Sequence, residues 1–189
     1  THYHADHTGG NETIGGAGAV IISHDNIRKR MTTEQVSIFM DSSTPPYAKD
    51  ALPVLTFNDR MSLHLNGETA TAYYVANGHT DGDSIIHFPI SNVIHMGDMY
   101  FNGLYPYVDL DAGGSIQGMV AAADLALSLA DDSTRIIPGH GPLAVVDDLQ
   151  TYRDFLQKAI NNVQPLIDQG LDLQQVIAAK PTEEWDEAL

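Results

Sequence analysis

The first ten residues hold the densest group of side chains in the sequence that could bind a metal ion. They read Thr-His-Tyr-His-Ala-Asp-His-Thr-Gly-Gly, so three histidines and one aspartate fall between positions 2 and 7. Alternate side chains of an extended segment share a face, so His2 and His4 can point at one metal ion. A turn after them can present Asp6 and His7 to a second ion. Imidazole nitrogens and carboxylate oxygens are the usual ligands of catalytic zinc, so this spacing predicts a metal site.

A purification tag or a solvated histidine-rich tip is the competing interpretation. Tags are runs of histidine, whereas this segment interleaves an aspartate and ends in Thr-Gly-Gly. The pattern therefore favours metal binding.

Three later stretches place a histidine or an aspartate next to glycine. They are Gly78-His79-Thr80-Asp81-Gly82-Asp83-Ser84, Met96-Gly97-Asp98-Met99-Tyr100-Phe101 and Pro138-Gly139-His140-Gly141-Pro142. Each is common by itself. Together with the first stretch, and in this order, they resemble the signature of the metallo-β-lactamase superfamily. The resemblance runs from residue 1 to about residue 145, with a helical tail beyond.

This resemblance implies a binuclear metal centre. The implied ligands are His2, His4 and His79 for the first metal, Asp6, His7 and His140 for the second, and Asp98 as the bridge between them. Two zinc ions suit these nitrogen and oxygen donors, with iron or manganese as alternatives. The implied activity is that of a hydrolase, in which a metal-bridging hydroxide oriented by Asp6 opens the carbonyl group of a β-lactam, lactone, ester or thioester.

Other functions remain open on the same ligands. A two-metal centre can also cleave small phosphodiesters, and a mononuclear iron persulfide dioxygenase uses a related scaffold. The flavodiiron branch is disfavoured, because it places Glu where His4 stands. A degenerate binding domain is disfavoured as well, since all seven ligand positions are filled.

Composition limits the partners. The chain has 189 residues, 9 Lys plus Arg and 25 Asp plus Glu, which gives a formal net charge of −16. So acidic a surface repels phosphate backbones, and nucleic acid is an unexpected partner. Membrane association is unexpected too, because no run of about 18 apolar residues occurs and basic residues are few. We expect a small-molecule substrate.

The cysteine count and the start of the chain carry further expectations. The absence of cysteine excludes disulfides and thiolate ligands, and the resemblance implies that Asp98 occupies the bridging place. Strands ordinarily precede the His-rich motif in this family, so we expect that the N-terminus of this chain is trimmed. No signal peptide is visible in the sequence. The compartment stays open between periplasmic or secreted and cytoplasmic. Unpaired strand edges would allow strand exchange and a homo-oligomer.

Hydrophobic patterns and turn residues predict an α/β protein of one domain, residues 1–189, with residues 146–189 as its C-terminal helical tail. Strands are predicted at 17–23, 53–57, 61–65, 69–76, 84–88, 92–96 and 134–137. Helices are predicted near Thr8 as a cap, twice within 25–39, and at 115–130, 146–169 and 173–179, with a loop at 42–46 and a kink or early end at Pro165. The resemblance implies a four-layer αββα sandwich, lacking its N-terminal strands.

The later ligands each come just after a predicted strand. His79 follows 69–76, Asp98 follows 92–96 and His140 follows 134–137. Strand ends on one sheet edge can converge, and the sheet then holds the ligands rigidly. The glycines beside them allow the sharp turns that a close approach to metal requires.

Several other residues are candidates for the surroundings of the metals. Phe101, Asn102, Tyr105 and Tyr107 follow the bridging aspartate and are predicted to line the substrate cleft, with packing under a loop as the alternative. Of the remaining histidines, His24, His64 and His87 are interpreted as structural, and His95 is the best candidate partner for Asp98. Asp81 and Asp83 are predicted either to bond ligand imidazoles or to cap the loop. No Lys or Arg adjoins a ligand motif, the nearest being Arg135, which disfavours a glutathione-thioester site.

Overall fold

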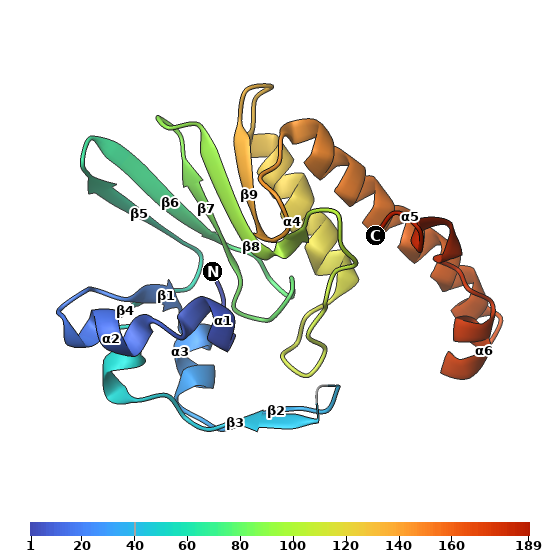
Figure 1. Ribbon diagram of the computed structural model, residues 1–189, viewed down its shortest axis with the longest axis horizontal. Helices are drawn as coiled ribbons and strands as arrows, with labels where there is room; N and C mark the ends of the chain where they lie inside the picture. The colour runs from blue at the N-terminus through green and yellow to red at the C-terminus, as the bar shows by residue number, and fades with distance from the viewer. Residues whose placement is uncertain (40) are drawn as a thin grey trace.

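A five-stranded sheet forms the centre of the computed structural model, which describes residues 1–39 and 41–189 (Figure 1). The strand order is β5-β6-β7-β8-β9. The strands are β5 (Arg60–Leu65), β6 (Glu68–Tyr74), β7 (Ser84–Phe88), β8 (Val93–Phe101) and β9 (Arg135–His140). Neighbours from β5 to β8 are antiparallel, and β9 is parallel to β8. The chain between these last two strands contains a helix, as a parallel connection requires.

Strand β8 lies inside the sheet and is almost entirely buried. Its pairing with β9 is irregular, with register shifts between His95 and Gly97 and between Gly97 and Phe101. Gly97 has φ +54°, and the side chain of Thr1 fills the space beside it, so no other residue fits here without strain. Such irregularities re-aim side chains, and this one lies where Asp98 must leave the strand.

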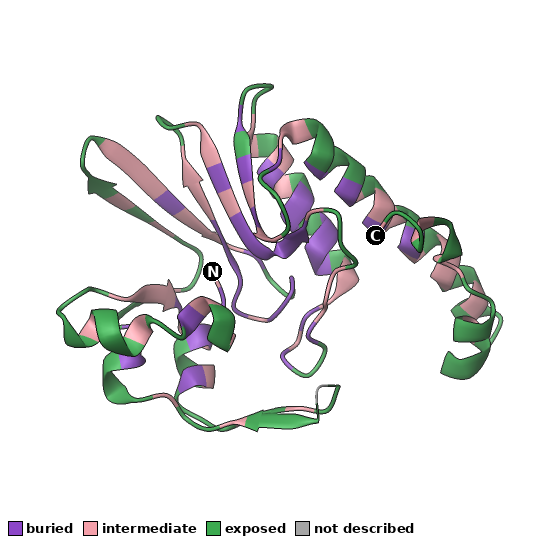
Figure 2. Ribbon diagram, in the orientation of Figure 1, coloured by how far each residue is buried: buried purple, intermediate pink, exposed green. Residues whose placement is uncertain are grey.

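Two helices, α4 (Ile116–Leu129) and α5 (Val146–Asp168), cover one face of the sheet. The main core lies between them and β7, β8 and β9, as the purple segments of Figure 2 show. Ser115 caps α4 by accepting a hydrogen bond from Gly118 N, at 3.0 Å. Ala122, Ala123 and Ala126 are fully buried, and these small side chains let α4 approach the sheet and α5 closely.

The N-terminal residues build a second, smaller region below the sheet in Figure 1. It contains α1 (Ala5–Thr8), α2 (Asn11–Gly16), α3 (Asp25–Met31), the short helix η1 (Lys49–Ala51), and the parallel pair β1 (Ile22–His24) and β4 (Leu55–Phe57). Its own core is formed by Tyr3, Ile27, Met31, Ala51 and Ala112. Tyr3 thus anchors the ligand-bearing segment among buried side chains.

Short elements complete the fold. The antiparallel hairpin β2 (Gln35–Ser37) and β3 (Ser42–Thr44) extends from α3, and α6 (Leu173–Ala178) and η2 (Glu183–Trp185) follow α5. Within the described part of the chain no helix combines the length and the apolarity needed to cross a bilayer.

Many predicted elements are confirmed. The strand at 84–88 has the predicted bounds, and α4, α5 and α6 lie within a residue of their predictions. Asn66 and Gly67 both have positive φ, which is the conformation that an Asn-Gly hairpin turn requires. Residues 104–114 contain no helix or strand, which fits the presence of Pro106, Gly113 and Gly114 in this stretch.

Other predictions were wrong. Thr8 ends α1 instead of capping a helix, because its hydroxyl donates back to His4 O, at 2.9 Å. Residues 35–37 and 42–44 pair as β2 and β3 where a second helix within 25–39 and a loop at 42–46 were predicted, since this pairing outweighs the weak helical pattern. The strand predicted at 17–23 covers only 22–24. Pro165 does not end α5 early, since the helix continues to Asp168.

Candidate metal centre

Three imidazole rings from distant parts of the chain meet beside β8. His4 Nδ1 lies 3.0 Å from both His2 Nε2 and His79 Nε2. His2 and His79 are buried, and His79 comes from the loop between β6 and β7. Asp98 Oδ2 faces this group, at 3.7 Å from His2 Nε2 and 3.6 Å from His79 Nε2. These four residues could hold one metal ion.

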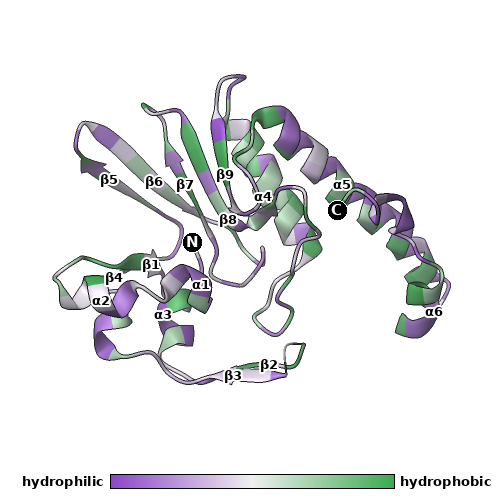
Figure 3. Ribbon diagram, in the orientation of Figure 1, coloured by the Kyte–Doolittle hydropathy of each residue, from purple (hydrophilic) through white to green (hydrophobic). Residues whose placement is uncertain are grey.

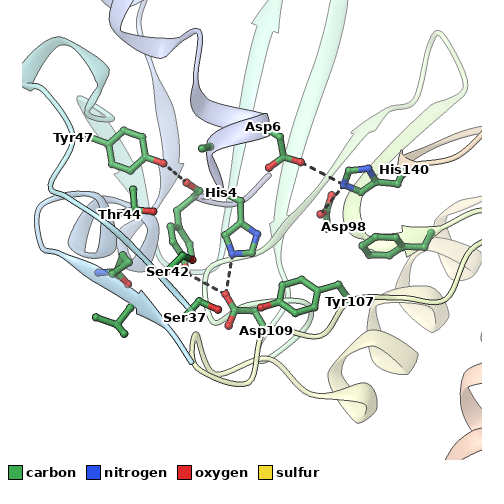
Figure 4. A pocket seen from close by; sticks show the side chains of 15 residues that line it. His4, Asp6, Ser37, Ser42, Thr44, Tyr47, Asp98, Tyr107, Asp109 and His140 are labelled. Atoms are coloured by element: carbon green, nitrogen blue, oxygen red, sulfur yellow. Dashed lines mark hydrogen bonds and ion pairs between the residues drawn. The ribbon is translucent and has the colours of Figure 1, made fainter. Parts of the chain in front are cut away.

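A second group shares Asp98. Asp98 Oδ1 lies 2.9 Å from His7 Nε2, and Asp98 Oδ2 lies 3.2 Å from His140 Nε2. Asp6 Oδ2 completes the group at 3.3 Å from His7 Nε2 and 3.4 Å from His140 Nε2, as Figure 4 shows for Asp6, Asp98 and His140. Asp6, His7, Asp98 and His140 could hold another ion. The structure therefore brings together all seven residues predicted as ligands, and Asp98 belongs to both groups.

The local fold explains how these side chains converge. Helix α1 turns the chain directly after His4 and brings Asp6 and His7 into the second ligand group, while the ring of His7 stays beside that of His2, with centroids 4.3 Å apart. Asp98 lies within β8 and His140 is the last residue of β9, so neither follows its strand as the sequence predicted. The bulged register of β8 brings Asp98 to the point that the end of β9 also reaches.

The outer nitrogens of two of these rings are fixed by acceptors. His4 Nε2 donates to Asp109 Oδ2, at 2.8 Å, and His79 Nδ1 donates to the carbonyl oxygen of Tyr107, at 2.7 Å. A neutral imidazole carries one N–H, so the inner nitrogens of both rings are then bare lone pairs. Two lone pairs at 3.0 Å repel each other unless a cation lies between them.

Two further observations fit a bound metal pair. Nitrogen ligands about 2.05 Å from a tetrahedral zinc lie about 3.3 Å apart, close to the separations among His2, His4 and His79. Asp98 Oδ1 is buried yet receives no well-directed hydrogen bond, although His7 Nε2 is near. A buried carboxylate oxygen without a donor is costly, and a cation would satisfy it.

The electrostatics of the site favour the ligand forms of these side chains. Burial, reinforced by the neighbouring imidazoles, holds the pKa of His2 well below its usual value, and burial lowers the pKa of His79 to about 4. Both rings are therefore neutral at pH 7. Burial alone would raise the pKa of Asp98, but the imidazoles of His7, His79 and His140 lower it below its usual value. Asp98 in turn raises the pKa of His7.

Asp109 is the functional residue that the sequence did not reveal. It is buried in the 104–114 loop and accepts from His4 Nε2, from Tyr3 OH at 3.1 Å, and through Oδ1 from Ala112 N at 3.0 Å. Carboxylate partners of ligand histidines orient the ring and raise its basicity. An aspartate in an irregular loop carries no spacing signal, so only the tertiary contact with His4 identifies it.

The loop from 78 to 84 is organised by its own aspartates. Asp83 accepts hydrogen bonds from Thr80 N, at 2.6 Å, and Thr80 Oγ1, at 2.9 Å, and burial raises the pKa of Asp83 to about 7. Asp81 forms a bidentate pair with Arg30, at 2.7 and 2.8 Å. Both aspartates therefore take the loop-stabilising role, and neither bonds a ligand imidazole.

The histidines outside the signature take structural roles where their contacts are seen. His95, predicted as the partner of Asp98, instead accepts from Gly97 N at 3.1 Å, because its ring folds back onto its own strand. His24 caps α3 and stacks on Tyr74, with ring centroids 3.8 Å apart. His64 bonds Thr69 across the β5–β6 hairpin.

A cavity of about 370 Å³ opens onto both ligand groups (Figure 4). It is lined by Tyr3, His4, Ala5, Asp6, Gln35, Val36, Ser37, Ser42, Thr44, Tyr47, Asp98, Phe101, Tyr107, Asp109 and His140. Of the predicted substrate contacts, Phe101 and Tyr107 line it. Asn102 and Tyr105 do not, because Asn102 Nδ2 bonds Pro142 O and Tyr105 OH bonds Asp186 and Thr182 in the C-terminal segment.

Sequence comparison identifies the family. The Metallo-beta-lactamase superfamily profile matches residues 1–144. The chain belongs to the metallo-beta-lactamase superfamily. Members of this superfamily are generally metal-dependent and hydrolytic. No curated protein sequence matches the chain.

Solved structures show the same metallo-β-lactamase fold at low identity. The BLEG-1 B3 metallo-beta-lactamase is 22% identical, with a TM-score of 0.68, over 82% of this chain and 74% of that one. A metallo-beta-lactamase from Pontibacter korlensis is 18% identical, with a TM-score of 0.64, over 83% of this chain and 66% of that one. TTHA1623 in a di-iron-bound form is 23% identical, with a TM-score of 0.61, over 80% of this chain and 72% of that one. The chain thus spans about two thirds to three quarters of the length of these three proteins.

Proposed function

We propose that this superfamily member is a hydrolase that holds two zinc ions and opens the carbonyl group of a β-lactam, lactone, ester or thioester. The observation that carries the proposal is the pair of ligand groups joined through Asp98. One carboxylate facing both groups is what a binuclear centre requires, whereas two unrelated clusters would not share a residue.

The assignment of ligands follows from which atoms face each other. His2 Nε2, His4 Nδ1 and His79 Nε2 would hold the first ion, and Asp6, His7 and His140 would hold the second, with Asp98 between them. When bound, such a pair of divalent ions polarises a carbonyl oxygen and lowers the pKa of water toward neutrality.

The protein's own side chains would transfer protons and hold the ligand rings in place. Asp6 is half-exposed at the edge of the cavity, so its carboxylate can accept a proton from water or pass one to a leaving group. The ring of Phe101 stacks on His140, with centroids 5.1 Å apart and planes 18° apart, and keeps that imidazole oriented. Asp109 and the Tyr107 carbonyl keep the rings of His4 and His79 in one tautomer.

Metal analysis with a substrate panel tests the proposal. We expect two zinc ions per chain after reconstitution, and hydrolysis of at least one of nitrocefin, an acyl lactone and an aryl ester. Asp98→Ala should lower the metal content and abolish that activity, whereas Asp124→Ala, on the exposed face of α4, should change neither. One iron per chain together with inactivity on the whole panel would contradict the proposal, and so would a preference for bis-nitrophenyl phosphate.

A further inference from the structure

The cavity over the ligand groups has two chemically different walls. One wall carries the metal-binding carboxylates and imidazoles. The other is the β2–β3 hairpin, which contributes Val36, Ser37, Ser42 and Thr44, as Figure 4 shows for the last three. Aromatic rings, including those of Phe101 and Tyr107, lie between the walls. A substrate whose reacting bond lies at the metals must therefore extend its remainder along the hairpin.

The cavity offers no Lys or Arg side chain to a substrate. Among its lining residues, all within the described chain, none is Lys or Arg, whereas Asp6, Asp98 and Asp109 are present. Arg30 lies nearby, 5.5 Å from the centre of the Tyr3 ring, but its guanidinium is already bonded to Asp81 and Gln35. A carboxylate on the distal part of a substrate, which would lie along the hairpin wall, would meet no Lys or Arg partner here.

The hairpin also presents apolar surface at the mouth of the cavity. Val36, which lines the cavity, and the nearby Ile38 and Phe39 are 63%, 80% and 77% exposed, and the hydropathy of this hairpin can be followed in Figure 3. Clustered exposed apolar side chains usually mark a binding surface. Contacts with the 104–114 loop hold the hairpin over the cavity. Ile38 N donates to Asp111 Oδ2, at 2.7 Å, and the Phe39 ring contacts Tyr107, with centroids 5.6 Å apart.

From these observations we infer the substrate class of the proposed hydrolase: an uncharged ester or lactone with an apolar acyl chain that lies against Val36 and Phe39. The inference rests on the proposed function for the reacting carbonyl. Its selectivity has two separate causes, burial of the chain against the hairpin and the lack of a Lys or Arg along that wall for an anionic substituent.

A substrate series tests both causes. With the zinc-loaded protein, kcat/KM for p-nitrophenyl esters should rise at least about tenfold from acetate to octanoate. Burial of each additional methylene should raise kcat/KM severalfold, so even partial burial of the longer chain gives this factor. Mono-p-nitrophenyl adipate should be at least about tenfold poorer than the hexanoate ester of equal chain length. The double variant Val36→Ser with Phe39→Ser should reduce the octanoate-to-acetate ratio below about threefold. Ser42→Lys should improve the adipate ester selectively.

A matched control and a binding measurement separate this inference from the proposed function. Leu65→Ser changes an exposed apolar residue at the end of β5, outside the cavity lining, and should keep the octanoate-to-acetate ratio. Calorimetry should show that octanamide, which resists hydrolysis, binds the zinc-loaded protein at least about tenfold tighter than butanamide, and that the double variant loses this difference.

Each outcome is decisive. Ester turnover without a chain-length or charge preference would overturn the inference and leave the proposed function standing. An octanamide preference that depends on the hairpin, without turnover of any ester, would support the apolar site and contradict the hydrolase. A double variant that alters the oligomeric state in sedimentation, with unchanged substrate ratios, would show that the hairpin pairs with a second copy and would overturn the inference.

Discussion

Single contacts decide whether the ligand side chains are ready to bind metal. The proton on His4 Nε2 is held by Asp109, so the nitrogen turned toward His2 and His79 is free to act as a ligand. Asp109 is itself fixed by Tyr3 and by the amide of Ala112. These contacts link the candidate metal centre to the core of the smaller region, so loss of the Asp109 carboxylate should lower the affinity for metal.

We predict that Asp109→Asn weakens binding of the first metal about 10- to 100-fold, because the neutral amide is a poorer acceptor for His4. Competition with a chelator of known zinc affinity measures the change. Asp124→Asn is the control, since Asp124 pairs with Arg153 on the helix surface. Equal affinities for wild type and Asp109→Asn would refute the role assigned to Asp109.

A second residue-scale prediction concerns pH. The pKa of Asp83 in the folded protein is about 7, above its ordinary value of 3.8, so the folded chain keeps a proton that the unfolded chain releases. Stability from this group is full below pH 4 and is lost as the pH rises toward and through 7.

Asp83→Asn should therefore flatten the fall in stability of the metal-free protein between pH 5 and 7.5, measured by urea unfolding. The amide oxygen can still accept from Thr80 N, so the loop should persist. An equally steep pH dependence in the variant would show that another group is responsible.

At the scale of elements, the bulged pairing of β8 with β9 sets the geometry of the bridge between the two ligand groups. Gly139 in β9 leaves the space that Asp98 occupies, and a Cβ atom there would overlap Asp98 Oδ1 and the backbone of Gly97. Glycine at position 139 is therefore needed for β9 to pack against β8 at Asp98.

We predict that Gly139→Ala destabilises the fold by about 1–3 kcal/mol and displaces Asp98, lowering the metal content below two ions per chain. Urea unfolding and metal analysis check the two effects. Gly10→Ala is the matched control from the opening motif, because a Cβ atom at Gly10 meets no atom within 4 Å. If both variants bound metal alike, the packing argument for Gly139 would fail.

At the scale of the molecule, the proposed metal ligands tie separate parts of the chain together. They come from the N-terminal segment, the β6–β7 loop, β8 and β9. Metal binding therefore requires the smaller N-terminal region to be docked against the sheet, and an unfolded chain cannot reproduce that arrangement. Binding should accordingly stabilise the whole fold.

We predict that Tm rises with zinc concentration and falls on chelation. The stabilisation should be about 2.7 kcal/mol for each site at a zinc concentration a hundredfold above its Kd. Scanning calorimetry across a zinc titration measures it, with magnesium as the control ion, since magnesium binds such nitrogen-rich sites weakly. An unchanged Tm over the titration would mean that the ligand groups do not bind zinc in the folded state.

The sequence by itself determined the family, the seven residues that converge beside β8, and most of the central sheet and its covering helices. It could do so because these features are local: His-x-His-x-Asp-His within one short segment, glycines beside each later ligand, and apolar patterns with clear turns between them. Asn66-Gly67 and Ser115 are cases where the neighbouring backbone alone fixes the structure.

Only the tertiary structure decided the surroundings of the site. Asp109 reaches His4 across 105 positions, and the β2–β3 hairpin forms where the helical pattern was too weak to hold against strand pairing. Asn102 and Tyr105, near Asp98 in sequence, turn away to contacts of their own. Contacts between residues far apart in the chain depend on how the elements pack, and no spacing along the sequence encodes them.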